Sequence, residues 1–414
     1  MIENSIRKQN FIKIGRRTSE NTVSGWLFLL LTAMYTVAYN ETLRAISILW
    51  YGVSAVTILV LLLLIVFNKP QGGISFFTGW AFIFFAYSAL SCLWALDVEP
   101  IFETMKTLLL VFATHVLLAE TIKSKKDIEN ILWANFIALL LVALFILLTM
   151  DLSSIGQDRI GVDGLGSLWN ANDIGLKMCV GAVISLYFAL KLKVILKRIP
   201  LLLCAAFFVI LALFTGSRKV VIMIIAVGVL IFFLKAKKHR SLVLVIGAVM
   251  TVALYFVTIK VDALYNVLGS RLEELINGLF QGGTTEGSFN LREEMISMGI
   301  NWFTERPIFG YGLSNFRVLY GEATGWATYS HNNFVEVLVG GGLVGFIIYF
   351  SAYAYVFVKL IKSAFKERNL LAILFFSLNT VVLVLQVALV SFSSTLFNCL
   401  LCLSFGYINV RERE

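Results

Sequence analysis

Residues 201–234 read LLLCAAFFVILALFTGSRKVVIMIIAVGVLIFFL, which is two apolar runs separated by one short polar turn. An α-helix rises about 1.5 Å per residue, so each arm of about 15 residues spans roughly 22 Å, less than the roughly 30 Å of hydrocarbon in a bilayer. The stretch therefore predicts two antiparallel helices inside a membrane. It also places the polar turn, residues 216–219, below the membrane surface within a protein-lined cavity.

The whole chain shares this apolar character. Of its 414 residues, 59% are hydrophobic and only 14% are charged, whereas a soluble globular protein carries about 45–50% apolar and about 25% charged residues. Too little polar surface remains for water to cover, which excludes a soluble multidomain enzyme. We predict an all-α polytopic integral membrane protein, with residues 1–414 forming a single membrane domain.

Apolar blocks of spanning length give about twelve predicted transmembrane helices. They are residues 24–40, 45–67, 74–96, 102–120, 131–150, 174–190, 200–215, 219–234, 241–259, 333–358, 370–388 and 391–409. Most of the 34 Lys and Arg residues fall in the connections on one side of these spans. Since positive connections stay inside, both termini are expected in the cytoplasm. The net charge of +9 therefore reflects topology, and no compact basic patch indicates a nucleic-acid partner.

Two connections are too long to be simple turns, and this topology puts both outside. Residues 151–173 form the smaller one. Residues 260–332 form a large extracytoplasmic loop between spans nine and ten, with helical patterns at 261–280 and 291–304. Long loops in compact proteins are usually functional. The chemistry should therefore face outward, away from ATP and nucleotide sugars.

Familiar cofactor motifs are absent from the sequence. It contains no phosphate-binding loop, no dinucleotide fingerprint after a strand, and no Asp-x-Asp pair for a metal-bound nucleotide sugar. The three histidines are far apart, which disfavours a zinc site. Cys399 and Cys402 have redox spacing but lie inside the last span, where we interpret them as packing residues. We expect neither a metal nor a cofactor.

Three arginines on the external side are candidates for binding a ligand. Arg218 lies in the buried turn, where an arginine is costly and by default functional, although a side chain reaching to the interface would also explain it. For Arg159 and Arg292, a surface ion pair is as good an explanation as a ligand contact. Other external arginines, such as Arg271 and Arg317, are weaker candidates.

His331 is the strongest single candidate. It opens the tenth span, where the positive end of a helix disfavours imidazolium and attracts anions, so a neutral imidazole could accept a proton. Asn333 and Glu336 have the spacing of a capping box. Glu336 shares a helix face with Asn332 and either holds this cap or orients the histidine.

A glycine pattern follows His331, and several aromatic residues lie in the external segments. Gly341 and Gly345 form a G-x-x-x-G pattern, which we interpret as close helix packing. The external segments also carry aromatic side chains that could stack on sugars: Trp302, Tyr311, Tyr320, Trp326 and Tyr329.

Taken in order, these elements resemble a known family. Arg159 with Asn170 comes first, Ser217-Arg218 follows, and Arg292 precedes the segment RPIFGYG at 306–312. The segment HNNFVE at 331–336 closes the series. The chain is similar to the O-antigen ligase and polysaccharide polymerase superfamily, and the similarity is densest between Arg292 and Gly345.

The resemblance implies an inverting, metal-independent glycosyltransferase. Its donor would be an undecaprenyl-diphosphate-linked oligosaccharide at the outer face of the bacterial cytoplasmic membrane. His331, Arg218 and Arg292 would be catalytic, the histidine as base and the arginines on the diphosphate. The substrate-binding residues would be Arg159, Asn170, Asn332 and Glu336. The bilayer is an expected partner, and whether a chain-length regulator is another partner is left open.

Three functions remain in competition. The segment GYGLSNF at 310–316 favours a polymerase, which joins lipid-linked repeat units for capsule, exopolysaccharide or O-antigen. A ligase would instead transfer the glycan to a lipid A core. A lipid-linked oligosaccharide flippase or other transporter belongs to a different class and would show internal repeats, of which the two halves give no convincing sign.

Overall fold

Helices make up every regular element in the part of the chain that the structure describes. The computed structural model describes residues 23, 25–68, 75–151, 153, 156–157, 159–160, 169–280 and 287–414. Within these residues, nine helices are long and apolar enough to cross a membrane. The protein is an all-α polytopic membrane protein, as predicted. Helices suit a bilayer because each one satisfies its backbone polar groups within its own segment.

Each of the twelve predicted spans coincides with a helix, although α2 (14 residues), α10 and α18 lie outside the nine, so the number twelve stays a prediction. The helices that match predicted spans are α2 (Trp26–Tyr39), α4 (Ser47–Asn68), α5 (Phe76–Leu90), α6 (Glu99–Thr121), α7 (Lys125–Thr149), α8 (Ala171–Lys191), α9 (Ile195–Phe214), α10 (Arg218–Lys235), α11 (Arg240–Lys260), α16 (Asn333–Lys362), α17 (Leu370–Leu385) and α18 (Thr395–Arg413). The remaining elements are α3 (Glu41–Ala45), η1 (Ser91–Leu93), α12 (Asp262–Leu264), η3 (Tyr265–Gly269), α13 (Ser270–Phe280), α14 (Gly287–Glu305), α15 (Phe316–Thr324), η4 (Ser363–Glu367) and η5 (Gln386–Ala388).

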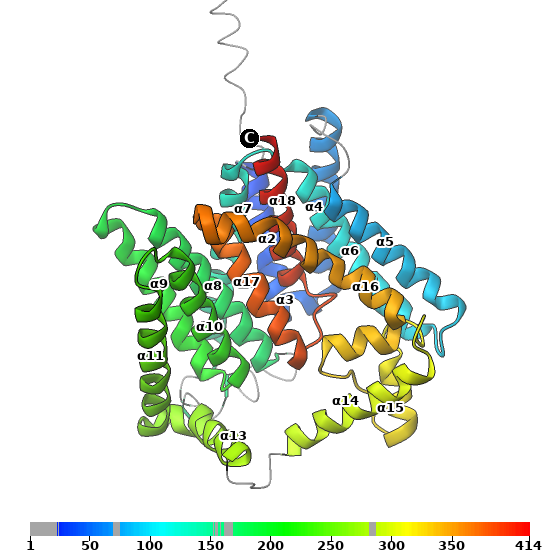
Figure 1. Ribbon diagram of the computed structural model, residues 1–414. Helices are drawn as coiled ribbons and strands as arrows, with labels where there is room; N and C mark the ends of the chain where they lie inside the picture. Colours follow the sequence, from blue (N-terminus) through cyan, green and yellow to red (C-terminus); the bar gives the residue numbers. More distant parts are fainter. Residues whose placement is uncertain are drawn as a thin grey trace, which may run out of the picture.

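The helices differ in how far the rest of the protein encloses them. Of the most apolar window of each span, 83% is buried in α8 and 67% in α17, but only 11% in α11. Figure 1 accordingly shows α11 at the edge of the bundle. Most of α8 is thus enclosed by the protein, whereas the polar residues Asn172 and Asp173 at its first turn stay partly exposed.

Both cysteines of the C-x-x-C pair pack between helices. Cys399 on α18 donates to the hydroxyl of Tyr35 on α2 at 3.2 Å, and Cys402 donates to the backbone carbonyl of His115 on α6, also at 3.2 Å. All four residues are buried. Such hydrogen bonds between membrane helices fix their relative register, so the packing interpretation of this pair is confirmed.

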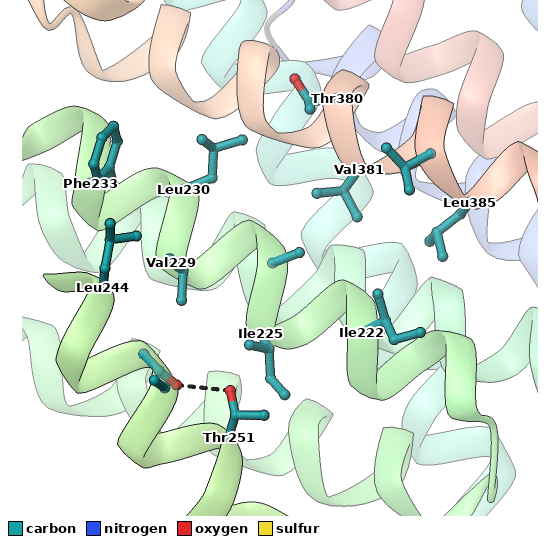
Figure 2. A pocket seen from close by; sticks show the side chains of 14 residues that line it. Ile222, Ile225, Val229, Leu230, Phe233, Leu244, Thr251, Thr380, Val381 and Leu385 are labelled. Carbon is teal, nitrogen blue, oxygen red and sulfur yellow. Dashed lines mark hydrogen bonds between the residues drawn. The ribbon is translucent and has the colours of Figure 1, made fainter. Parts of the chain in front are cut away.

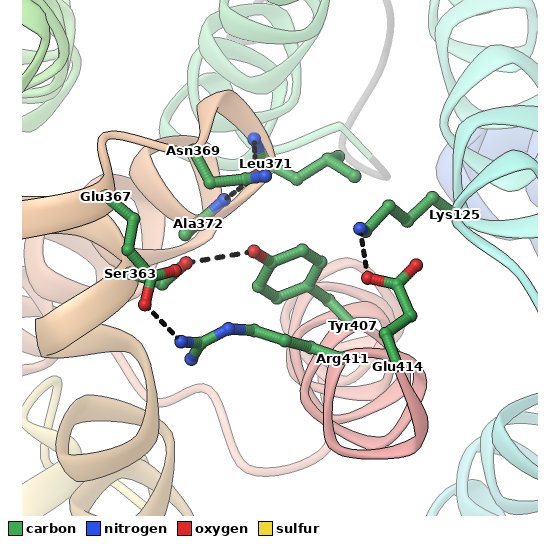
Figure 3. Close-up of polar contacts among 9 residues, drawn as sticks. All are labelled: Lys125, Ser363, Glu367, Asn369, Leu371, Ala372, Tyr407, Arg411 and Glu414. Atoms are coloured by element: carbon green, nitrogen blue, oxygen red, sulfur yellow. Dashed lines mark hydrogen bonds and ion pairs between the residues drawn. The ribbon is translucent and has the colours of Figure 1, made fainter.

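The far end of α18 is tied to its neighbours by ion pairs (Figure 3). Arg411 pairs with Glu367 in η4, and Glu414 pairs with Lys125 at the start of α7, both at 2.5 Å. Exposed pairs of this kind contribute only about 0–1 kcal/mol each. They fix one end of α18 at the top of Figure 1, while its first residue, Thr395, lies at the other end.

Helix α16 is broken at Gly342, where the backbone adopts φ +59° and ψ −164°. The break frees backbone N–H groups, and the connection after α14 accepts them. Leu343 donates to the carbonyl of Pro307 at 2.8 Å, and Val344 donates to that of Ile308 at 3.2 Å. A Cβ at position 342 would lie 2.3 Å from the carbonyl oxygen of Ile308, so only glycine fits here.

The same connection also binds the first half of α16. Tyr311 and Gly312 donate their N–H groups to the carbonyls of Val339 and Gly340, both at 2.9 Å. Gly310 turns the chain at φ +70°, with its Cα facing the backbone of α16. Residues 307–312, with the pattern P-x-x-G-x-G, therefore complete the hydrogen bonds of a broken membrane helix. They also attach the large connection to the bundle.

Gly341 and Gly345, the two glycines of the G-x-x-x-G pattern, pack against the side chain of Tyr87 and not against the backbone of another helix. The phenol of Tyr87 on α5 donates to the carbonyl of Gly341 at 2.5 Å. A Cβ at Gly345 would lie 2.9 Å from the Tyr87 ring. The prediction of close packing is confirmed, but the partner is the tyrosine.

The large connection contains the two predicted helical regions and one helix that was not predicted. α12, η3 and α13 cover the pattern at 261–280, and α14 covers that at 291–304. The unpredicted helix is α15, which packs Phe316 and Tyr320 against Met295 of α14 and Val335 of α16. This small core holds α14 and α15 beneath the bundle (Figure 1).

Candidate functional site

A cavity of about 340 Å³ lies where several connections meet at one end of the bundle. Its walls come from the starts of α6, α8, α10, α15 and α16 and from the connection between α17 and α18, residues 389–394. The predicted alternation of spans puts all of these connections on one face of the membrane. The polar side chains in the walls include Thr104, Asn170, Asn172, Asp173, Lys219, Ser314, Arg317, Tyr329, His331, Glu336, Ser393 and Ser394.

Four long helices begin at this cavity, besides the short α15. Their N-cap residues are Asn170 for α8, Ser217 for α10, Asn332 for α16 and Ser394 for α18. The first N–H groups of a helix have no partners within the helix, and the helix dipole adds positive potential there. Four such ends around one cavity make it favourable for an anion.

His331 precedes α16 in a conformation that L-residues seldom adopt. Its φ is +54°, and its imidazole lies against the ring of Tyr329 with centroids 4.2 Å apart. Backbone strain of this kind persists where surrounding structure fixes it, and it clusters at functional sites. The left-handed backbone aims the histidine into the cavity instead of along the helix.

The electrostatic surroundings keep this imidazole neutral. Burial is the largest effect, and the positive charges of Arg292 and Lys219 add to it, so the pKa of His331 falls to about 4. The residue is therefore uncharged at neutral pH, as the sequence predicted, and its free ring nitrogen can accept a proton.

The capping box predicted for Asn333 and Glu336 is wrong. The N-cap is Asn332, whose side-chain oxygen accepts the N–H groups of Phe334 at 3.0 Å and Val335 at 3.2 Å. Asn333 instead joins α16 to the end of α17, where its amide donates to Gln386 at 2.7 Å. The helix therefore begins one residue earlier than the predicted capping box would require, which leaves Glu336 outside the cap.

Glu336 holds the segment that carries the histidine. Its carboxylate accepts the backbone N–H of Ser330 at 2.9 Å, and the Ser330 hydroxyl donates to the carbonyl of Asn332 at 2.8 Å. Ser330 and Asn332 flank His331 in the chain. Of the two roles left open for Glu336, orientation of the histidine is the closer description, and it acts through the backbone.

The α9–α10 turn presents a different cation to the cavity from the one predicted. Arg218 begins α10 and directs its guanidinium to the backbone carbonyl of Arg271 at 3.4 Å. Arg159 donates to the carbonyl of Thr215 at 2.8 Å and so supports the turn from the first external loop. Neither arginine lines the cavity, whereas Lys219 does.

Arg292 lies on α14, half-buried, and its charge reaches the cavity. It acts on His331 and also on Tyr329. The predicted histidine and one predicted arginine are therefore brought within electrostatic reach of each other from segments about 40 residues apart in the sequence.

A cluster of ion pairs lies at the start of α8, beside the cavity. Lys177, with 6% of its side chain exposed, pairs with Asp173 at 2.5 Å and with Glu41 of α3 at 2.9 Å. Asp173 lines the cavity and Asn172 beside it accepts the Ser217 hydroxyl at 2.7 Å. The first turn of α8 is thus fixed both to α3 and to the α9–α10 turn.

Sequence reasoning missed several cavity residues. Ser314 bonds to Thr104 on α6 at 2.7 Å and, like His331, has a left-handed backbone, with φ +62°. The sequence makes Arg317 only a weak candidate, and it does not single out the two serines before α18, Ser393 and Ser394. Their only sequence signal is a polar residue near the end of a span, which is too common to single them out.

The aromatic candidates separate into two groups. Trp302, Tyr311 and Tyr320 belong to the small core of the large connection. Tyr329 lines the cavity, and Trp326 has 53% of its surface exposed. The last two remain the candidates for stacking on sugar.

The fold and this cavity define a polytopic membrane protein with a polar, anion-favouring site at one end of its helices. The family model described as O-antigen ligase matches residues 202–350, and the match confirms the resemblance to the O-antigen ligase superfamily. No curated protein matches the chain. The matched part runs from α9 into the second half of α16 and includes Arg218, Arg292, His331 and Glu336. It indicates a membrane glycosyltransferase-like enzyme.

Proposed function

We propose that this protein polymerises undecaprenyl-diphosphate-linked oligosaccharide repeat units at the outer face of the bacterial cytoplasmic membrane. The product would be capsule, exopolysaccharide or O-antigen. The observation that carries this proposal is the neutral His331 beside a cavity at which four helix N-termini and several cations meet. A proton acceptor next to an anion site is what glycosyl transfer from a lipid diphosphate requires.

The donor would place its diphosphate among the helix N-termini. Lys219 and Arg317 line this part of the cavity, and Arg292 adds its charge from α14. Arg218 and Arg159 stabilise the adjoining turn, so their contribution would come through the shape of the site. Because the diphosphate leaves with its negative charge, cations and N–H dipoles stabilise the transition state and replace a metal.

The reaction is a single displacement at the anomeric carbon. An acceptor sugar hydroxyl attacks that carbon while the bond to the diphosphate oxygen breaks, and the electron pair of that bond leaves with the undecaprenyl diphosphate. The hydroxyl proton passes to the ring nitrogen of His331. Attack from the face opposite the leaving group inverts the anomeric configuration.

The lipid chain has a suitable neighbouring groove. An apolar cavity of about 690 Å³ lies between α10, α11 and α17, and Figure 2 shows its side chains. Ile222, at one end, lies one turn beyond Lys219, and Leu385 on α17 precedes the cavity residue Leu389. A lipid with its diphosphate at Lys219 could therefore lay its chain along this groove.

Reconstitution tests the proposal. Purified protein in liposomes receives an undecaprenyl-diphosphate-linked repeat unit, and gel analysis measures glycan length while a second assay measures released undecaprenyl diphosphate. We expect both to rise together, and His331→Ala to lower the rate about 10²- to 10⁴-fold, as for loss of a general base. His239→Ala, in the connection before α11, is the matched control. Full activity of a correctly folded His331→Ala protein would contradict the mechanism.

A second acceptor distinguishes the ligase alternative. The description of the matching family, O-antigen ligase, is the reason to test it. If glycan appears on added lipid A core and no lengthening occurs without it, the protein is a ligase. Lengthening on lipid-linked repeats alone supports the polymerase.

A further inference from the structure

Lys219 is a half-buried lysine in the wall of the cavity. Its ammonium donates to the backbone carbonyl of Ala388, and among the described residues it has no carboxylate within ion-pair distance. The positive charges of Arg292 and Arg218 act on the same ammonium. Burying a charge without a partner is costly, so a bound anion would stabilise this ammonium.

The carboxylates of the cavity are occupied elsewhere. Asp173 pairs with Lys177 at 2.5 Å, and Glu336 accepts the N–H of Ser330 at 2.9 Å. Neither pairs with Lys219. A bound anion would therefore meet Lys219 without competition from these carboxylates, and the helix N-termini beside Lys219 favour an anion with several oxygen atoms.

Helix geometry explains why the lysine and not the preceding arginine takes this position. Successive residues of an α-helix point about 100° apart. At the start of α10, Arg218 turns toward Arg271 on α13, which leaves Lys219 facing η5 and the cavity. Lysine acts on phosphate as a compact point charge with three donors, so it can hold the carbonyl of Ala388 and still bind an anion.

We propose that Lys219 is the principal residue of the α9–α10 turn that contacts the diphosphate of the lipid-linked donor. The inference rests on the proposed function and assigns the direct contact to a residue that the sequence did not single out. A diphosphate with two negative charges matches a cavity whose wall carries the Lys219 ammonium and the Arg317 guanidinium, whereas a neutral lipid alcohol would gain nothing from these charges.

Binding measurements on the full-length protein in nanodiscs test this assignment. The probes are undecaprenyl diphosphate, undecaprenol and inorganic pyrophosphate. We expect Lys219→Met to weaken binding of undecaprenyl diphosphate by about 10- to 100-fold, the range for a lost hydrogen bond to a charged group. Lys219→Arg should restore most of the affinity. Lys235→Met, which removes an exposed lysine at the other end of α10, should bind like the unmodified protein.

The three probes identify which part of the lipid the protein recognises. Undecaprenol should bind equally to the unmodified protein and to Lys219→Met. Inorganic pyrophosphate should compete with undecaprenyl diphosphate on the unmodified protein and much less on Lys219→Met. If Lys219→Met bound undecaprenyl diphosphate as tightly as the unmodified protein did, the assignment would be wrong. Binding of pyrophosphate without any Lys219-dependent binding of the lipid would also overturn it.

Chemical protection gives a second test that needs no variant. Purified protein is treated with acetic anhydride with and without undecaprenyl diphosphate, and mass spectrometry measures acetylation of each lysine. The lipid should protect Lys219 and leave Lys235 unchanged; equal acetylation of Lys219 in both samples contradicts the assignment. Lys219-dependent binding without glycan lengthening would refute the proposed polymerase but leave the contact between Lys219 and the diphosphate standing. Lengthening that does not depend on Lys219 would support the polymerase and refute this contact.

Discussion

The phenol ring of Tyr329 covers one face of the His331 imidazole, with ring centroids 4.2 Å apart and planes inclined by 45°. Both rings line the cavity. The stack, together with the left-handed backbone of His331, leaves the histidine little freedom to rotate. This contact therefore positions the proposed base.

Replacing Tyr329 should separate the effect of its ring from that of its hydroxyl. Tyr329→Phe keeps the stack, so we expect kcat close to that of the unmodified protein. Tyr329→Leu loses an aromatic contact of about 0.5–1.5 kcal/mol and should lower kcat about threefold to tenfold. Steady-state kinetics with the lipid-linked repeat unit measures this. A larger loss in Tyr329→Phe would assign the role to the hydroxyl instead.

The pH profile should report an unusually acidic histidine. Burial, and then the charges of Arg292 and Lys219, lowers the pKa of His331 to about 4. Because only the neutral ring accepts a proton, kcat/KM should stay level as pH falls and decline only around pH 4. An ordinary histidine would give a decline near about 6.5.

The arginine offers a control for this profile. Arg292→Gln removes one of the charges that disfavour imidazolium, so the acidic decline should move to higher pH. Arg306→Gln removes a cation that lies over Tyr311 instead, and it should leave the midpoint in place. An unmoved midpoint in Arg292→Gln would show that its charge does not reach the base.

The break in α16 should be sensitive to one methyl group. Gly342→Ala places a Cβ within 2.3 Å of the Ile308 carbonyl oxygen at a positive φ, so we expect destabilisation of about 1–3 kcal/mol. Gly228→Ala on α10 is the matched control, since a Cβ there would meet nothing within 4 Å. It should be neutral or stabilising by up to about 1 kcal/mol. Thermal unfolding in detergent compares them, and equal midpoints would contradict this account.

Replacing Lys177 should leave two carboxylates that repel each other. Lys177→Met leaves Asp173 and Glu41 without their shared cation. Because 43% of the Asp173 side chain is exposed, water screens part of the effect, and we expect a loss of about 1–3 kcal/mol, less than for a fully buried pair. Adding Glu41→Gln removes one of the two charges and should restore part of the stability. Chemical or thermal unfolding of the single and double variants measures the coupling, and additive losses would mean that the three residues do not act together.

The apolar groove should matter only for donors with a long lipid. Ala226→Trp fills part of the cavity between α10 and α11 and should raise KM for an undecaprenyl donor several-fold. A donor with a short prenyl chain should be much less affected, because it would not reach the blocked part. Ala55→Trp, on an exposed face of α4, is the control. Equal effects on both donors would place the lipid chain elsewhere.

Much of the architecture follows directly from the sequence. The apolar runs on either side of residues 216–219 can be satisfied only as helices in lipid, and the helices lie where the runs predicted. His331 was also recognisable, because a histidine just before a long apolar helix has few structural explanations. These features depend on local composition, which the sequence states fully.

Tertiary structure decided which side chains face the cavity. Arg218 and Lys219 are adjacent in sequence, yet a rotation of about 100° between them sends one toward α13 and the other into the wall. The break at Gly342 depends on carbonyl groups supplied by the distant Pro307 segment. Periodicity gives the faces of each helix, but the direction of a face is set by contacts between segments far apart in the chain, and only the folded structure contains them.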